Sequence, residues 1–196
     1  MKLGLQLAAG MRVGLYGGSF DPAHQGHAQV AETARRRLGL DRVIWLVTPG
    51  NPLKAAGGAA ALVARVAGAA ARARGPRSVV SDAERRLGSR YTLDTVRRLK
   101  ARFPGVRFVW IMGADNLAAF HFWRGWTTLL KEIPVAVVSR PGLAMKRRFS
   151  PMARRFAGAR LASGAARRLA WATPPAWIYL TAPLNPISSM AVRNST

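Results

Sequence analysis

A pair of histidines is the most informative chemical feature of the sequence. His24 and His27 lie three residues apart in a glycine-rich stretch, residues 17–27, that reads GGSFDPAHQGH. At this spacing both side chains share one face of a helical turn, so both can donate hydrogen bonds to neighbouring phosphate oxygens. When protonated, they can also stabilise the charge that builds up during attack on a phosphoryl group. These residue types therefore predict a site for phosphate chemistry.

The position of this stretch supports the same interpretation. It follows a short apolar segment and precedes an amphipathic one, as expected at the junction between a strand and a helix. Glycines at such a junction let the backbone approach a phosphate, and the next helix directs its free N–H groups and positive dipole at the same anion. Two isolated histidines would more often be partly exposed residues at a helix start, but the flanking glycines favour the anion site.

The composition leaves little room for a metal site made of protein ligands. The chain has three histidines, no cysteine and only eight acidic residues. A zinc site would have to combine His121 with carboxylates that the sequence hardly supplies. We therefore expect no metal held by side chains. The absence of cysteine also excludes disulfides and thiolate catalysis, and it is compatible with the reducing cytoplasm, where we expect the protein to act.

A second candidate anion site lies near the end of the chain, where residues 187–193 read ISSMAVR. A serine is a favourable N-cap, and Arg193 follows Ser189 by four residues, on the same face of the expected helix. The planar guanidinium of Arg193 can fork onto phosphate oxygens. Taken alone, Ser188 and Ser189 followed by an arginine would indicate only a capped, solvated helix.

The elements that must position these residues follow an α/β pattern. Short β-branched or aromatic runs alternate with segments of helical character, which is typical of buried parallel strands joined by crossover helices. The expected strands are Arg12–Tyr16, Arg42–Thr48, Arg77–Ser81, Arg107–Met112, Ile133–Ser139 and Trp177–Thr181. We therefore predict a single Rossmann-like, doubly wound parallel sheet.

Three helices are expected between these strands. In the first, Val30, Ala34 and Leu38 recur every four residues and Gly39 ends the helix. In the second, Thr92 is the expected N-cap, the apolar stripe runs to Phe103, and Pro104-Gly105 stops the helix. The Ala- and Gly-rich stretch Gly57–Arg74 is expected to be a loop followed by a helix.

Length and composition indicate one domain. The chain has 196 residues, of which 49% are hydrophobic, enough for one full-sized core. Residues 1–11 are expected to form a leader before the first strand. No uninterrupted apolar run reaches the length of a membrane span, because Arg65 breaks the longest one.

The charge balance is the unusual feature. Lys and Arg total 31 against 8 acidic residues, a net charge of +23. The basic residues concentrate in the segment 143–170, above all in Lys146–Arg168. This excess permits an added role in binding nucleic acid, with that segment as the contact surface, although no known nucleic-acid module is recognisable.

The two phosphate motifs together resemble a known signature. GSFDP-x-H-x-GH followed near the C-terminus by ISS-x-x-x-R is similar to the nucleotidyltransferase superfamily. Within it, the rest of the chain resembles the bacterial nicotinate mononucleotide adenylyltransferases. The matching pieces are Thr48–Lys54, Arg90–Thr95, Gly113–Asn116, Phe120–Trp123 and Ser139–Gly142. Met190 stands where this family usually has Thr, which removes one hydroxyl but leaves both serines and the arginine.

This resemblance implies roles for individual residues. Gly17, Gly18, Ser19 and Phe20 would line the nucleotide site, together with Ser188 and Ser189. His24 and His27 would bind the ATP phosphates, Lys54 and Arg193 would neutralise phosphate charge, and Asp115 would contact a ribose. Trp123 would stack on the pyridine ring, with main chain near Thr92 and Arg124 reading its carboxylate. ATP is then a co-substrate, and Mg²⁺ would be carried on its phosphates.

Other interpretations of these residues and of the activity stay open. Asp115 could be a helix N-cap, and Trp123 or Trp126 an ordinary core aromatic, which is the better interpretation for Trp126. The nearest enzymatic alternative is an adenylyl- or cytidylyltransferase for another phosphorylated acceptor, such as phosphopantetheine. The expected reaction is transfer of AMP from ATP to nicotinate mononucleotide, giving deamido-NAD and pyrophosphate. The sequence does not fix the oligomeric state.

Overall fold

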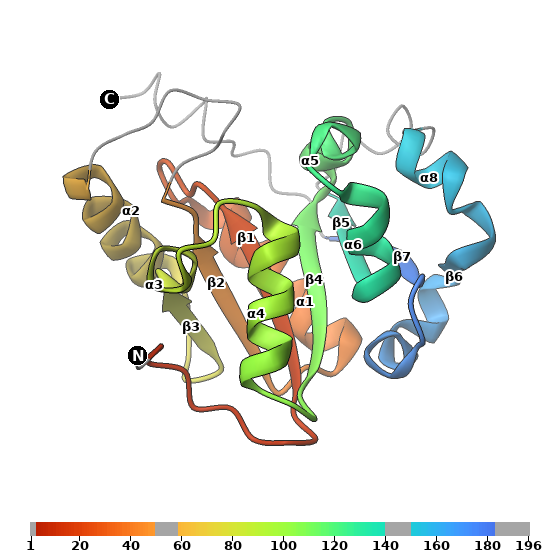
Figure 1. Ribbon diagram of the computed structural model, residues 1–196, viewed down its shortest axis with the longest axis horizontal. Helices are drawn as coiled ribbons and strands as arrows, with labels where there is room; N and C mark the ends of the chain where they lie inside the picture. Colours follow the sequence, from red (N-terminus) through yellow and green to blue (C-terminus); the bar gives the residue numbers. More distant parts are fainter. Residues whose placement is uncertain (1–2, 50–58, 140–149, 183–196) are drawn as a thin grey trace.

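The computed structural model describes residues 3–49, 59–139 and 150–182. Its centre is a parallel sheet with the strand order β3-β2-β1-β4-β5-β7-β6 (Figure 1). The strands are β1 Arg12–Gly18, β2 Arg42–Val47, β3 Ser78–Ser81, β4 Arg107–Gly113, β5 Val135–Ser139, β6 Arg160–Leu161 and β7 Trp177–Thr181. This sheet confirms the predicted fold class.

The strand order places a topological switch point beside the first strand. From β1 the chain moves outward to β2 and β3, then returns to pair β4 on the other side of β1 and continues outward. Tyr16 of β1 is in register with Trp45 of β2 on one side and Ile111 of β4 on the other. In open parallel sheets, ligands bind outside the carboxyl ends of the strands at such a reversal. The stretch 17–27 begins at this edge.

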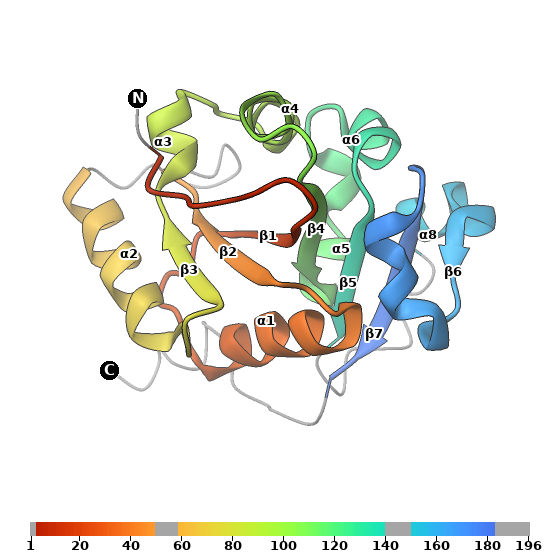
Figure 2. The same cartoon turned by 90° about the horizontal axis from the view of Figure 1, so that it is seen from below.

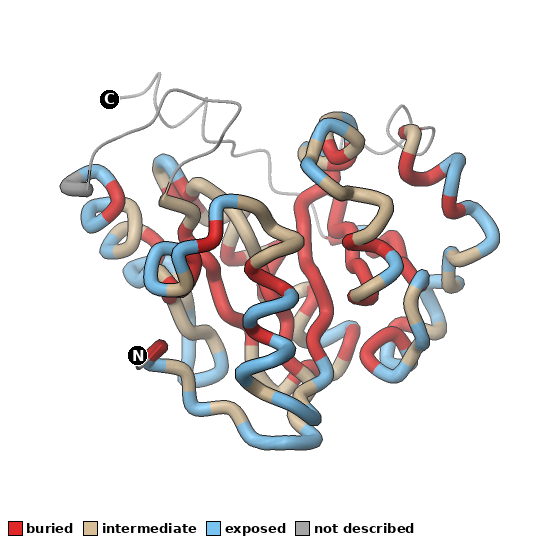
Figure 3. Tube along the Cα trace, viewed as in Figure 1, coloured by how far each residue is buried: buried red, intermediate tan, exposed pale blue. Residues whose placement is uncertain are grey.

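Helices cover both faces of the sheet and enclose two cores (Figure 2). One face carries α1 Gln25–Leu38, α2 Ala59–Arg72 and the 3₁₀ segment η3 Ser163–Trp171. The other carries α3 Ala83–Leu87, α4 Thr92–Arg102, α5 Ala114–Leu117, η1 Phe120–Phe122, α6 Trp126–Glu132 and α8 Pro151–Arg155. The central strands are buried between these layers, as Figure 3 shows.

Several sequence predictions hold closely. Helix α1 buries Val30, Ala34 and Leu38, and it ends at Gly39, whose φ of 65° is the left-handed conformation that glycine adopts at least cost. All five residues of β5 are buried, as expected for a central parallel strand covered on both faces. Gly57 and Gly58 lie outside the described residues, but the helix expected after them is present as α2.

Other predictions need correction. Tyr91, not Thr92, is the N-cap of α4, and Thr92 is the first helical residue; the cap position has extended dihedrals and no side-chain cap bond. Strands β1 and β4 run to Gly18 and Gly113, beyond the expected ends, because each continues its pairing with a neighbour into the glycine that follows. Strand β5 starts at Val135 rather than Ile133.

The basic segment is partly a structural element of the fold. Within it, the two-residue strand β6, with the 3₁₀ turn η2 Ala157–Ala159 before it, pairs with β7 through Arg160 and Trp177. No sequence pattern indicated this strand, because two residues are too few to show a period. Met152 and Leu169 are fully buried, so the segment contributes to both cores.

The N-terminal residues also pack on the domain. Leu3 is buried and Leu5, Leu7 and Met11 lie against the second core, so the described part of the expected leader is attached to the sheet layer rather than detached from it. In the parts of the chain that the structure describes, no helix is long and apolar enough to cross a bilayer.

Candidate active site

The carboxyl ends of β1 and β4 bring two of the predicted groups to one edge. Gly17 and Gly18 end β1, and Gly113 ends the adjacent β4, two residues before Asp115 on the short helix α5. Asp115 is exposed at this edge. Gly113 is the N-cap of α5 and makes no side-chain cap bond, so the alternative interpretation of Asp115 as the N-cap is wrong.

Close packing explains the glycines of the first motif. A Cβ on Gly17 would overlap the indole ring of Trp110, and one on Gly18 would approach the Phe20 ring to 3.1 Å. Phe20 itself has φ of 49°, a left-handed conformation that is uncommon for a non-glycine residue. It is held there by burial, with its ring 5.2 Å from that of Tyr16 and 5.1 Å from that of Trp45. Such strain held by packing is common at ligand sites.

The two histidines form the cap of helix α1. Nδ1 of His24 accepts the backbone N–H of Gly26 at 3.1 Å, and Nδ1 of His27 accepts the backbone N–H of His24 at 3.2 Å. This is a reciprocal capping box in which both acceptors are imidazoles rather than hydroxyl and carboxylate groups. In the neutral form of either ring, an Nδ1 that accepts a hydrogen bond leaves the proton on Nε2.

The rings are held in a fixed stack. Their centroids lie 3.8 Å apart with an interplanar angle of 32°, and the Phe20 ring is edge-to-face with that of His27, with centroids 5.1 Å apart. His24 is 2% exposed, whereas His27 is half-buried. Sequence reasoning placed these histidines at a helix start but missed that they cap it. Their three-residue spacing, which is that of a capping box, was the available signal.

A second group of predicted residues meets where α4 begins. The Arg124 guanidinium lies over the Tyr91 ring at 4.6 Å, so Thr92 and Arg124 belong to one neighbourhood. Leu93 packs against Gly125, where an added Cβ would come within 2.8 Å of the leucine side chain. That main chain near Thr92 and Arg124 reads the carboxylate of the pyridine ring stays a prediction.

Trp123 lies beside this group and is half-buried. Its ring is 5.2 Å from Phe120 and 6.2 Å, edge-on, from Trp110, whose indole also fills the space next to Gly17. One buried tryptophan therefore joins the glycine motif to Trp123. Trp126 packs against the same core, which agrees with its interpretation as a core aromatic.

Arg65, which sequence reasoning did not single out for function, links the loops at the carboxyl ends of β1 and β2. The Arg65 guanidinium, from α2, donates to the carbonyl oxygens of Ser19 at 2.9 Å, Thr48 at 2.8 Å and Pro49 at 3.2 Å. In the sequence, Arg65 was only the charge that interrupts an Ala/Gly/Val run. The signal that was available is that an arginine in the middle of an Ala-rich helix has room to reach the backbone of a neighbouring loop.

Four predicted residues lie outside the described part of the chain, so their positions stay predictions. They are Lys54, Ser188, Ser189 and Arg193. Within the described part, no three histidine or carboxylate side chains come together as a metal-binding group.

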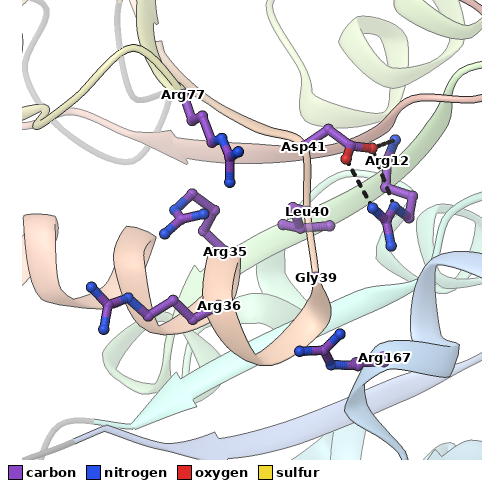
Figure 4. A pocket seen from close by; sticks show the side chains of 8 residues that line it. All are labelled: Arg12, Arg35, Arg36, Gly39, Leu40, Asp41, Arg77 and Arg167. Atoms are coloured by element: carbon purple, nitrogen blue, oxygen red, sulfur yellow. Dashed lines mark hydrogen bonds and ion pairs between the residues drawn. The ribbon is translucent and has the colours of Figure 1, made fainter.

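A separate basic cleft lies at the opposite, amino-terminal edge of the sheet (Figure 4). It has a volume of about 360 Å³ and contains none of the predicted site residues. Arg12, Arg35, Arg36, Gly39, Leu40, Asp41, Arg77 and Arg167 line it. Arg12 pairs with Asp41 at 2.8 Å, and Arg35 and Arg36 share Glu32. Only one lining residue, Arg167, comes from the basic segment.

Comparison with known proteins agrees with this arrangement. Residues 15–195 match the cytidylyltransferase-like family. A probable nicotinate-nucleotide adenylyltransferase of Caulobacter sp. (strain K31) is 64% identical over 93% of this chain and 97% of its own length. A protein of the same name from Cereibacter sphaeroides is 54% identical over the same shares.

A solved structure supports the fold. The nicotinic acid mononucleotide adenylyltransferase of Plasmodium falciparum, complexed with NaAD, superposes with a TM-score of 0.68 at 16% identity. The match covers 94% of this chain and 83% of that one. With the fold, the histidine motif and the close relatives in agreement, the chain belongs to the nicotinate-nucleotide adenylyltransferase family.

Proposed function

We propose that this protein transfers the AMP unit of ATP to the 5′-phosphate of nicotinate mononucleotide, forming deamido-NAD and releasing pyrophosphate. The observation that carries the proposal is the histidine capping box at the switch-point edge of the sheet. It belongs to a chain whose close relatives bear the name of this activity.

The capping box prepares the histidines for anions. With Nδ1 of each ring accepting a backbone N–H, each neutral imidazole presents its Nε2–H as a donor without having to change tautomer. The same bonds and the ring stack fix the direction of those donors before substrate arrives, so little reorganisation is needed in the transition state. We assign contacts with the ATP phosphates to both rings and, to the more accessible His27, charge stabilisation at the reacting phosphorus.

No protein nucleophile is required. The phosphate of the mononucleotide is an anionic attacker, so its oxygen forms the new bond to the α-phosphorus while the bond to the leaving pyrophosphate breaks. The work of the protein is then alignment and electrostatic stabilisation. Gly17 to Phe20 would line the nucleotide, Asp115 would contact a ribose, and Lys54, Ser188, Ser189 and Arg193 would meet phosphate oxygens.

The acceptor would occupy the neighbourhood of α4. A pyridine ring stacked on Trp123 would lie next to the main chain of Thr92 and Arg124, whose N–H groups could receive the carboxylate. The half-buried position of Trp123 supports this assignment, because part of its ring is accessible while the rest is held by Phe120 and Trp110.

In this proposal Mg²⁺ binds through the phosphates of ATP, because Mg²⁺ is commonly held by substrate phosphates with few protein ligands. Bound there, it would neutralise phosphate charge. The cytoplasmic location and any role in binding nucleic acid stay predictions.

The acid group and the ring of the acceptor can be tested separately. Nicotinate mononucleotide should be used at least about tenfold better in kcat/KM than nicotinamide mononucleotide, because a lost charged hydrogen bond costs about 1.5–3 kcal/mol. Trp123→Ala should raise KM for both mononucleotides and leave KM for ATP nearly unchanged. Equal use of the two mononucleotides would refute the carboxylate-reading assignment. A matching rise in KM for ATP would place Trp123 in the core instead.

A further inference from the structure

Thr48 makes hydrogen bonds through its backbone N–H, its carbonyl oxygen and its hydroxyl group. It directly follows β2, and its backbone N–H donates to the carbonyl oxygen of Gly18 at 3.1 Å, which ties the ends of β2 and β1 together. Its carbonyl oxygen accepts the Arg65 guanidinium, and its hydroxyl is hydrogen-bonded to the carboxyl group of Glu84. The two charged residues come from different helices on opposite faces of the sheet, α2 and α3.

The Arg65 side of this contact joins the glycine motif to the end of β2. A single guanidinium bonds the carbonyl oxygen of Ser19, in the motif, and those of Thr48 and Pro49. Carbonyl oxygens at loop positions have no strand partner, so these bonds replace the ladder where the sheet ends. A planar group with five N–H donors can serve three acceptors in fixed directions, which a lysine ammonium cannot do with the same geometry.

The Glu84 side joins Thr48 to the start of α4. Glu84 is 7% exposed, and its Oε1 lies 3.5 Å from the hydroxyl of Thr95. That hydroxyl is also 3.2 Å from the carbonyl oxygen of Tyr91 and 2.8 Å from the hydroxyl of Ser89. Glu84 thus reaches the first turn of the helix that begins at Thr92.

Glu84 is buried, and its carboxyl group is hydrogen-bonded to the hydroxyls of Thr48 and Thr95. Burial raises its pKa to about 7, and the hydrogen bonds from the hydroxyls of Thr48 and Thr95 partly oppose that rise. Burying a carboxyl group is costly, and a packed apolar side chain of similar size would fill the same space at lower cost. A buried carboxyl that bonds two elements of the proposed site therefore suggests a role in arranging them.

We propose that Arg65 and Glu84 are positioning residues that both hydrogen-bond to Thr48, from opposite faces of the sheet. Arg65 fixes the backbone position of the glycine motif, and Glu84 fixes the position of the first turn of α4. This proposal rests on the proposed function, because the first element would hold ATP and the second the acceptor. Neither residue touches substrate. Loss of Arg65 should therefore affect the use of ATP, and loss of Glu84 the use of the mononucleotide.

Kinetics of two variants test this division. Arg65→Lys should lower kcat/KM for ATP about tenfold and leave KM for nicotinate mononucleotide within twofold. Glu84→Leu, which keeps the volume and removes both hydrogen bonds, should raise KM for the mononucleotide about tenfold and leave KM for ATP within twofold. Glu84→Gln retains a hydrogen-bonding group and should recover most of the loss seen with leucine.

Matched controls come from the same kinds of element. Arg72 lies on the exposed surface of α2, and Glu132 makes a surface ion pair with Arg97. The variants Arg72→Lys and Glu132→Gln should therefore keep the wild-type kcat and both wild-type KM values. Thermal unfolding of every variant separates folding from positioning. A purely structural role would lower Tm and the active fraction while leaving the KM of the folded enzyme unchanged, or would change both KM values alike. Either pattern would overturn the proposal.

Thr48→Val provides a milder variant should Arg65→Lys or Glu84→Leu fail to fold. It removes only the hydroxyl, so it should raise KM for the mononucleotide a few-fold and leave KM for ATP within twofold. Unchanged KM values in Thr48→Val, or an equal rise in both KM values, would contradict the role of the contact between Thr48 and Glu84. Inactivity of the wild-type protein with both substrates would refute the proposed function and this proposal with it, whereas an active wild-type protein with unchanged KM values in the variants would refute the positioning roles alone.

Discussion

The two edges of the sheet use charge in opposite ways. The amino edge has five arginines around a cleft of about 360 Å³, together with Asp41 and the C-terminal turn of α1. The carboxyl edge has glycine backbone, two stacked imidazoles and the start of α1. At the amino edge, Arg12, Arg35 and Arg36 are already bonded to protein carboxylates.

This contrast shows that a high local positive charge does not by itself make an anion-binding site. A cluster of cations opposite a helix C-terminus largely balances the negative end of that helix and nearby acids. At the carboxyl edge, three kinds of donor can point at the same ligand: backbone N–H groups, the N-terminus of a helix and the imidazole N–H groups. Their electrostatic effects on a bound anion therefore add. The size of a hollow and the number of arginines are therefore poor guides to where the chemistry takes place in this molecule.

The largest expected effect is that of His27→Ala. If His27 stabilises charge that develops only in the transition state, kcat should fall roughly 10²–10³-fold while ATP binding and fold are largely retained. Steady-state kinetics, ATP titration and thermal unfolding would measure this. Gln25→Ala, in the same helical turn, is the control and should keep wild-type turnover. Near-normal turnover of His27→Ala would contradict the claim that the chemistry takes place at the carboxyl edge.

The pH dependence of stability should differ in sign between the edges. Burial raises the pKa of Glu84 from 4.5 to about 7, so its ionisation disfavours folding as pH rises from 4.5 to 7. Glu84→Gln should therefore match wild type near pH 4.5 and exceed its stability by up to about 3 kcal/mol at pH 8. Denaturant unfolding at the two pH values measures this.

At the amino edge, hydrogen bonds from Arg12 hold the pKa of Asp41 below its usual value of 3.8. The ionised form favours folding, so Asp41→Asn should cost stability at neutral pH and lose that deficit as pH falls below about 4. The effect should be small because the pair is partly exposed. The same sign of pH dependence in both variants would contradict the account of Glu84.

Glycine substitutions should distinguish the edges by activity. Gly17→Ala places a Cβ against the Trp110 indole and should cost about 1–3 kcal/mol of stability and reduce kcat/KM as well. Gly39→Ala forces a left-handed φ on alanine and should cost about 1 kcal/mol with no change in kcat. Unfolding and kinetics on the same preparations would show whether the two effects separate. Equal loss of activity would mean that both edges shape the site.

The smallest effect is expected from the basic cleft. Arg77→Gln combined with Arg167→Gln should leave kcat within about twofold. Replacing four or more arginines of Lys146–Arg168 by Gln should leave kcat within a few-fold and weaken any DNA binding, which should fall steeply between 50 and 200 mM salt. Loss of turnover without unfolding would show that the basic segment contributes to catalysis.

The sequence was a good guide to the frame because parallel strands are short, apolar and separated by helices of recognisable period. It located Gly17, Gly18, His24 and His27 because their types have few other uses at a strand-to-helix junction. It did not find β6, since two residues carry no period, nor Tyr91 as a cap, since backbone dihedrals rather than side-chain type define that position.

The arrangement around Thr48 was beyond reach of the sequence for another reason. Arg65, Thr48 and Glu84 come from three separate elements, and their contacts depend on how α2 and α3 dock on opposite faces of the sheet. Residue type and spacing along the chain carry no information on such docking. In the sequence, Arg65 and Glu84 were two ordinary charges among helical residues.

The most direct test of the central claim is to identify the acceptor and the product. Purified protein would be incubated with ATP, Mg²⁺ and, separately, nicotinate mononucleotide, nicotinamide mononucleotide and phosphopantetheine, and both pyrophosphate and the nucleotide product would be quantified. We predict one deamido-NAD for each pyrophosphate with nicotinate mononucleotide, at the highest kcat/KM of the panel. Adenylylation of phosphopantetheine in preference, or no pyrophosphate with nicotinate mononucleotide, would contradict the account.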